Sequence, residues 1–223
     1  MNDINYTDED RPVPDWTSAG CNPTPWPSPC WIVSTPRSGS TWLSAMLNIS
    51  TFRRECPEVP EKDVFCEHFH PKYGHTYPHY EPIVTKVHVN WLDDPLLVQQ
   101  LPSLDTKIIL LTRNDHVQQV WSMIASSASK IFNTKSEDRR DTYRQALMNV
   151  RVSQNELTTH LAAIDRWERL GKFLFTHHNI YQLSYEELLA SPRVWVEAVL
   201  SWMGMSASDF SYQESEFLRL RCS

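Results

Sequence analysis

A short strand, a polar turn and the start of a helix follow one another in the stretch VSTPRSGSTWLSAML, and this succession limits the possible folds more than any other part of the chain. Backbone N–H groups at a helix N-terminus, with the helix dipole behind them, make an anion site. The hydroxyls of Ser38, Ser40 and Thr41 add donors at the same turn. The stretch therefore predicts an α/β protein with a phosphate-binding turn after its first strand.

The turn departs from the form found in nucleotide triphosphatases, which reads GxxxxGK followed by Ser or Thr. Gly39 is the only glycine in the turn and Arg37 is the only cation. An arginine offers a planar fork of donors where a lysine offers a point charge, so bidentate contact with phosphate or sulfonate oxygens is possible.

Length and charge narrow the class of protein. A chain of 223 residues is long enough for one α/β domain with a sizeable core. Residues 1–29 are rich in proline and polar groups, so we expect an extended segment there and a single domain over 30–223. The net charge of −6 argues against a nucleic-acid partner, which needs a clustered basic face.

The cysteines and the N-terminal residues indicate the cellular compartment of the protein. Five cysteines without a CxxC pair favour a reducing environment over a disulfide framework. The acidic start MNDINYTDEDRP has no basic region or apolar run typical of a secretion signal, and no later apolar run has membrane-spanning length. These features predict a cytoplasmic protein without a membrane partner.

Further strands and helices alternate along the chain. Apolar runs predict strands over 31–35, 82–89, 107–112 and 179–184, and helical periodicity predicts a helix over 41–49. Strands that alternate with helices imply a mostly parallel sheet with helices on both faces, a three-layer α/β sandwich with a P-loop-like turn after the first strand.

Helix boundaries follow from capping residues. Apolar residues at helical spacing predict one long helix or two abutting ones over 138–170, stopped by Gly171. The other expected boundaries are an N-cap at Asn114 or Asp115, an N-cap at Asp94 with Pro95 behind it, and a final helix from Ser191 and Pro192 to Gly204.

Four segments, in this order, resemble those of sulfotransferases, enzymes that use 3′-phosphoadenosine 5′-phosphosulfate (PAPS). PRSGSTWL resembles the 5′-phosphosulfate loop, usually PKSGTTW or PRSGST. PIVTKVH is similar to the segment that carries the general base of cytosolic sulfotransferases, LTRNDHVQQVWS to the 3′-phosphate segment, and LSYEELLASPRVWVEAVLSWMG to a late YEDL-like turn and helix. The residues of these segments combine features of the cytosolic and the bacterial trehalose-sulfotransferase-like branches.

The resemblance implies a residue set for the donor. Arg37 with Ser38, Gly39, Ser40 and Thr41 is expected to hold the phosphosulfate. Arg113 with Ser122 is expected to hold the 3′-phosphate, and Trp42 and Tyr185 to contact adenine. The alternatives are a structural salt bridge for Arg113 and core packing for the two aromatic residues.

For the reaction, the resemblance places His88 as general base, and histidine titrates near neutral pH. Lys86 lies two residues earlier on the same side of the strand, where it and Arg37 can stabilise charge on the leaving phosphate. The trehalose-type branch carries a glutamate base on its first helix, and Ala45 or a neighbour stands there in this chain. A purely structural, hydrogen-bonded His88 is the alternative.

Two sequence features and two alternative functions have to be considered beside this interpretation. The cytosolic Arg-Lys-Gly segment near the C-terminus is missing; Arg219 and Arg221 could substitute for it, although a charged tail is more often only solvated. CEHFH, residues 66–70, has three potential zinc ligands, although we expect no metal. A small-molecule kinase would need a loop lysine and an acidic Mg²⁺ ligand at a strand end; the loop has no lysine, and KIILLT and IVTKVH offer no aspartate there. A non-catalytic PAPS-binding module is the remaining alternative.

The acceptor is less defined than the donor. Acidic residues gather in the segment expected to roof its pocket, which favours a polar or cationic small molecule such as a natural product, although a solvated acidic face explains them equally well. These residues are Glu55, Glu58, Glu61, Asp63 and Glu67. Oligomeric state is not readable from the sequence.

Overall fold

The computed structural model describes residues 30–55, 84–93, 102–131 and 137–214. Within them a four-stranded sheet has the order β2-β1-β3-β4. All three pairings are parallel, so the expected α/β class with a parallel sheet is confirmed. The strands are β1 (Cys30–Ser34), β2 (Val84–His88), β3 (Lys107–Thr112) and β4 (Ile180–Ser184).

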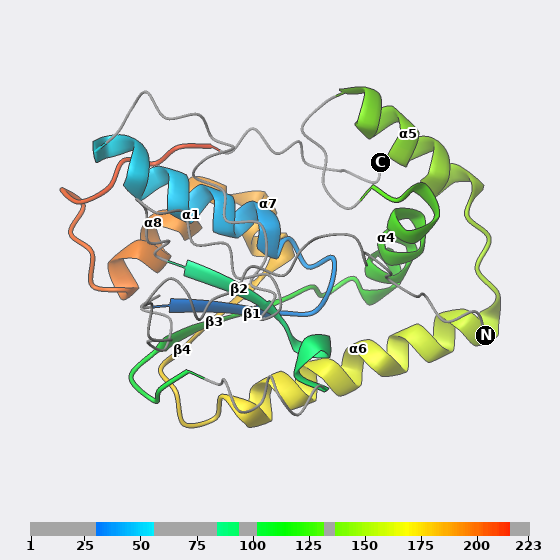
Figure 1. Cartoon of the computed structure of the whole chain (residues 1–223), viewed down its shortest axis with the longest axis horizontal. Coiled ribbons are helices and arrows are strands. Elements are labelled where there is room, and N and C mark those ends of the chain that lie inside the picture. The colour runs from blue at the N-terminus through cyan, green and yellow to red at the C-terminus, as the bar shows by residue number, and fades with distance from the viewer. Residues whose placement is uncertain (1–29, 56–83, 94–101, 132–136, 215–223) are drawn as a thin grey trace, which may run out of the picture.

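Helices cover both faces of this sheet, as Figure 1 shows. One face carries α1 (Ser40–Glu55), α7 (Tyr185–Ala190) and α8 (Pro192–Trp202), and the other carries η2 (Val89–Asp93) and α6 (Gln154–Leu174). Because alternate strand residues point to opposite faces, Cys30 and Ile32 join the core under α1 and α8, whereas Trp31 and Val33 join the core over α6.

Two further helices, α4 (His116–Ser129) and α5 (Glu137–Asn149), lie beyond the C-terminal ends of the strands (Figure 1). They pack on each other around Ala125, Tyr143 and Val150. The expected N-cap of α4 is present at Asp115, whose side chain accepts a hydrogen bond from the Gln118 amide at 2.9 Å. The α4–α5 pair therefore borders the edge of the sheet where β1, β2 and β3 end.

The region predicted as one helix or two abutting ones forms α5 and α6. Ser153 and Glu156 form a capping box that starts α6. The prediction that Gly171 stops the helix is wrong, because α6 continues to Leu174. A Cβ at position 171 would lie 3.2 Å from Val89 Cγ2 and 3.6 Å from Leu110 Cδ1, so the glycine allows α6 to approach the sheet closely.

The last helix agrees with its expected boundaries in part. Pro192 is its first residue, but the Ser191 side chain makes no capping hydrogen bond. The helix ends at Trp202, and Gly204 follows with a φ of +91°.

Several predictions lie outside the described residues. They concern the proline-rich segment 1–29, the cap at Asp94 and Pro95, the CEHFH segment, the acidic residues between 56 and 67, and the tail arginines at 219 and 221. In the described ranges no helix is long and apolar enough to cross a membrane. In the same ranges no group of three histidine, cysteine or acidic side chains is placed to hold a metal ion.

Candidate active site

The turn between β1 and α1 has an unusual backbone. Arg37 has a φ of +65° and Gly39 a φ of +86°, both in the left-handed region. A non-glycine residue is strained there, and such strain is typical of functional turns. Gly39 is required for a second reason, because an added Cβ would lie 2.6 Å from Cδ2 of Tyr185. The loop is therefore shaped by its own backbone and by the aromatic ring packed against it.

Buried hydrogen bonds brace this loop from inside. The Ser38 hydroxyl donates to the Thr35 carbonyl at 2.7 Å. The side-chain nitrogen Nε2 of Gln119, on α4, donates to Thr35 Oγ1 and to the Pro36 carbonyl, both at 2.7 Å. The hydroxyl proton of Ser38 is thus used within the loop, and its backbone N–H is the group that remains for an anion.

Thr41 sits in the first turn of α1 and is linked to β2. The buried Lys86 ammonium donates to Thr41 Oγ1 at 2.8 Å. A lysine ammonium only donates, so the threonine oxygen accepts and its own O–H can donate to a third group. Lys86 and Thr41 therefore provide a charge and a hydroxyl donor beside the loop.

The two expected anion sites are joined by one side chain. Arg37 Nε donates to Ser122 Oγ on α4 at 2.9 Å, and Arg113 Nη1 donates to the Arg37 carbonyl at 3.3 Å. The structure thus links Arg37, predicted for the phosphosulfate, to Arg113 and Ser122, predicted for the 3′-phosphate. Two arginines this close to a helix N-terminus form a strongly positive site.

Arg113 also stacks on Tyr185, with its Cζ 4.8 Å from the ring centroid. The neighbouring Glu186 accepts hydrogen bonds from the Asn114 and Asp115 amides at 3.0 and 3.2 Å. These contacts hold the turn after β3 against α7. Arg113 makes no ion pair with any carboxylate of the described residues, so they provide no support for a structural salt bridge.

His88 ends β2 opposite Ser34 in the register of the two strands. Ser34 Oγ lies 3.2 Å from His88 Nδ1, and the Trp91 ring meets the imidazole edge-on at 4.8 Å between centroids. Ser34 is buried and His88 is half-buried. These contacts hold the ring at the end of β2, and the role of His88 as a base stays a prediction.

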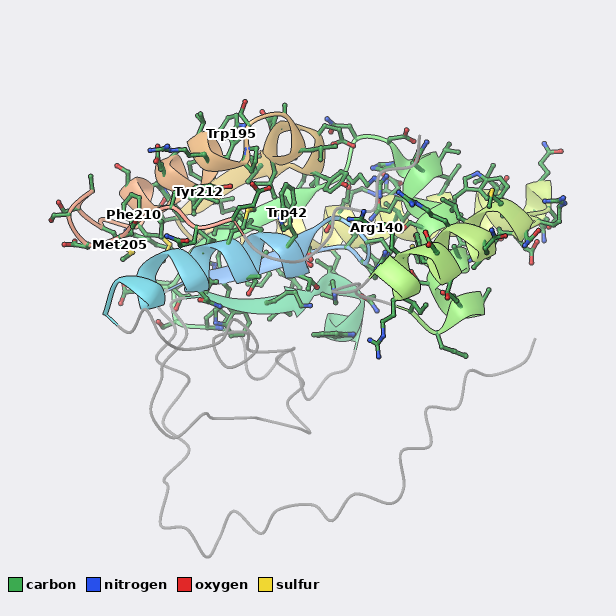
Figure 2. The ribbon with its side chains drawn as sticks, turned by 90° about the horizontal axis from the view of Figure 1, so that it is seen from above. Trp42, Arg140, Trp195, Met205, Phe210 and Tyr212 are labelled. Carbon is green, nitrogen blue, oxygen red and sulfur yellow. The ribbon has the colours of Figure 1, made fainter. Side chains whose placement is uncertain are left out.

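Trp42 is 7% exposed and belongs to the core cluster between α1 and α8. Figure 2 shows it on α1, with Trp195, Met205, Phe210 and Tyr212 toward the α8 side. These four residues pack against the same cluster. The contact of Trp42 with adenine stays a prediction.

Sequence reasoning missed three residues that support the site, namely Ser34, Gln119 and Glu186. Gln119 had a recognisable signal, since it lies three residues before Ser122 and therefore on the same face of a helix. Ser34 and Glu186 had none, because their partners are 54 and 72 residues away in the chain.

Comparison with known proteins agrees with this geometry. The family model described as "Sulfotransferase domain" matches residues 27–219. Nodulation protein H of Rhizobium tropici is 26% identical over 204 residues, which cover 84% of this chain and 80% of that protein. The family implies a sulfonate donor, typically PAPS. Because the family model covers most of the chain and the sheet is parallel as expected, the chain belongs to the sulfotransferase domain family and is a sulfotransferase.

Proposed function

We propose that this sulfotransferase moves the sulfuryl group of PAPS in line to a hydroxyl or amine of a small-molecule acceptor. The observation that carries the proposal is the hydrogen-bonded chain from Arg113 through Arg37 to Ser122 at the C-terminal edge of the sheet. PAPS has two separate anionic groups, a 5′-phosphosulfate and a 3′-phosphate, and it needs positive groups for each. ATP lacks the 3′-phosphate and would leave half of such a site unused.

The loop is suited to the phosphosulfate. In this proposal its oxygens accept from backbone N–H groups of residues 38–41, from the Ser40 and Thr41 hydroxyls and from Arg37. Arg113 and Ser122 hold the 3′-phosphate, while Tyr185 and Trp42 contact the adenine. Residues 30–223 form the single catalytic domain, with 1–29 as an extended segment.

Sulfuryl transfer resembles phosphoryl transfer in its loose transition state, so alignment and charge stabilisation dominate. The acceptor oxygen or nitrogen forms a bond to sulfur, the bond from sulfur to the phosphate oxygen breaks, and adenosine 3′,5′-bisphosphate (PAP) leaves. Lys86 and Arg37 stabilise the charge that builds on that oxygen.

His88 takes the proton that the acceptor loses. Neutral imidazole has one donor and one acceptor nitrogen, so Nε2 can accept a proton only in the tautomer that carries hydrogen on Nδ1. In that tautomer Nδ1–H donates to Ser34 Oγ, which lies 3.2 Å away. A serine hydroxyl can donate or accept, so Ser34 accommodates the tautomer that the base requires without selecting it.

The test is a transfer assay with PAPS and a panel of alcohols, phenols and amines, followed by mass spectrometry of the sulfated product. We expect His88→Ala to lower kcat by roughly a hundred to ten-thousandfold while PAP affinity stays within about twofold. The exposed His177 provides a matched control, and His177→Ala should transfer as the unmodified enzyme does.

Two outcomes would contradict the proposal. An unchanged kcat in His88→Ala would remove this residue from the mechanism. Tight PAP binding without transfer to any acceptor would favour a binding module over the proposed reaction.

A further inference from the structure

The hydroxyl of Ser122 has two side-chain partners. Arg37 Nε lies 2.9 Å from Ser122 Oγ, and the phenol oxygen of Tyr143, on α5, lies 2.8 Å from it. Tyr143 also donates to the Ser122 backbone carbonyl at 3.4 Å. A tyrosine of α5 is thus in direct contact with the residue expected to bind the 3′-phosphate.

The protons of this group can be assigned by their chemistry. Arginine only donates, so Ser122 Oγ accepts from Arg37. If the Tyr143 proton points to the Ser122 carbonyl, the single Ser122 proton goes to the Tyr143 oxygen. When an anion lies beside Ser122, the serine turns its proton to the anion, and Tyr143 must donate to Ser122 Oγ instead. A phenol can both accept and donate, so it satisfies Ser122 in both states.

We propose that Tyr143 is a positioning residue for the donor's 3′-phosphate, acting through Ser122. This inference rests on the proposed function and adds a residue of α5 to the same site. Tyr143 itself does not contact the phosphate; it holds the Ser122 hydroxyl in the orientation that donates to it.

Burial and charge around Tyr143 support this role. The side chain is 1% exposed, and the Arg37 guanidinium carbon lies 5.7 Å from its ring centroid. Arg140, labelled in Figure 2, stands three residues earlier and is half-buried, whereas Arg139 and Arg144 are exposed. The Arg37 guanidinium over the ring places positive charge beside Tyr143 and Ser122, which favours an anion over a cation there.

Tyr143→Phe tests the proposal because it removes only the hydroxyl and keeps the ring. Calorimetry should show about a fivefold to tenfold loss of PAP affinity, as expected for one hydrogen bond, with ADP affinity unchanged. In a Ser122→Ala background the same substitution should change PAP affinity by less than about twofold, because the group through which it acts is gone. Tyr181→Phe is the matched control, since Tyr181 is a half-buried tyrosine on β4 that packs on Trp202, and it should bind PAP normally.

Each other result has a distinct meaning. Unchanged PAP affinity in Tyr143→Phe overturns the inference, and so does an equal loss for PAP and ADP. If Tyr143→Phe lowers PAP affinity equally in the Ser122→Ala background, Tyr143 acts through packing and not through Ser122, and the inference is overturned. If the unmodified protein itself does not prefer PAP to ADP, the proposed function fails, and the inference fails with it.

Discussion

The two ends of β3 carry cations in opposite surroundings. Lys107 begins the strand and donates to the carbonyls of Trp202 and Met203 at 3.0 and 2.7 Å, at the C-terminal end of α8. Arg113 follows the strand and donates to the carbonyl of Arg37, beside the N-terminal end of α1. One cation meets the negative end of a helix dipole, and the other lies near the positive end of one.

This difference separates a structural charge from a functional one. The charge of Lys107 is compensated within the fold, and its Nζ also lies 5.6 Å from the Trp202 ring centroid. Arg113 has neither a helix C-terminus nor a carboxylate partner among the described residues. A positive group placed near another arginine and a helix N-terminus destabilises the empty protein slightly, and a bound anion reverses that effect.

Cys30 at one end differs in solvent access from three polar residues at the other end. Cys30, the register partner of Lys107, is buried, and burial raises the pKa of its thiol to about 12. The neutral thiol therefore persists at physiological pH, and Cys30 is unreactive. At the opposite end Arg37, Thr41 and His88 are half-buried.

The largest difference in stability should come from substitutions of Gly39, in the loop after β1, and Gly204, beside Lys107. Both glycines have positive φ, but only Gly39 is also crowded by a neighbouring side chain. Gly39→Ala places a Cβ 2.6 Å from the Tyr185 ring in addition to the backbone strain, and we expect a loss of about 2–4 kcal/mol in unfolding free energy. Gly204→Ala meets only Lys107 Nζ at 3.8 Å, so strain alone should cost about 1–2 kcal/mol. Urea unfolding measures both variants.

Titration of the same two variants with PAP gives a second difference between them. Gly39→Ala should lose PAP affinity and Gly204→Ala should keep it. Equal stability of the two variants would show that Tyr185 does not limit the space at the loop.

A smaller effect is expected for Lys107→Met, which removes the charge and keeps a long apolar side chain. Loss of the interaction with the C-terminus of α8 should lower the unfolding free energy by about 1–2 kcal/mol. Thermal unfolding followed by circular dichroism gives the stability, and PAP titration should give the unmodified affinity. A tenfold weaker PAP binding would contradict the separation of the two ends.

The sheet and the loop were readable from sequence because local signals determine them. KIILLT is a buried parallel strand and therefore apolar at nearly every position, and the prediction for it agrees with β3 at both ends. Arg37, Arg113, Ser122, Lys86 and His88 were found because ordered segments resembled a known family, and the parallel register brings their strand ends to one edge.

The features that the sequence did not predict depend on contacts between distant parts of the chain. Gly171 looked like a helix stop, but it allows α6 to pack against Val89 and Leu110. In the sequence, Tyr143 is only one apolar position of a predicted helix. Its hydroxyl acquires a role when α5 packs on Ser122, 21 residues earlier. No local pattern encodes either contact.

The central claim is that the cation at the C-terminal end of β3 exists for the 3′-phosphate of the donor. Calorimetric titration with PAP and with ADP, using the unmodified protein, Arg113→Ala and Lys107→Met, tests it most directly. We expect the unmodified protein and Lys107→Met to prefer PAP, and Arg113→Ala to lose about tenfold to a hundredfold of PAP affinity with little change for ADP. Equal affinities for PAP and ADP in the unmodified protein, or a preference that survives in Arg113→Ala, would contradict the account.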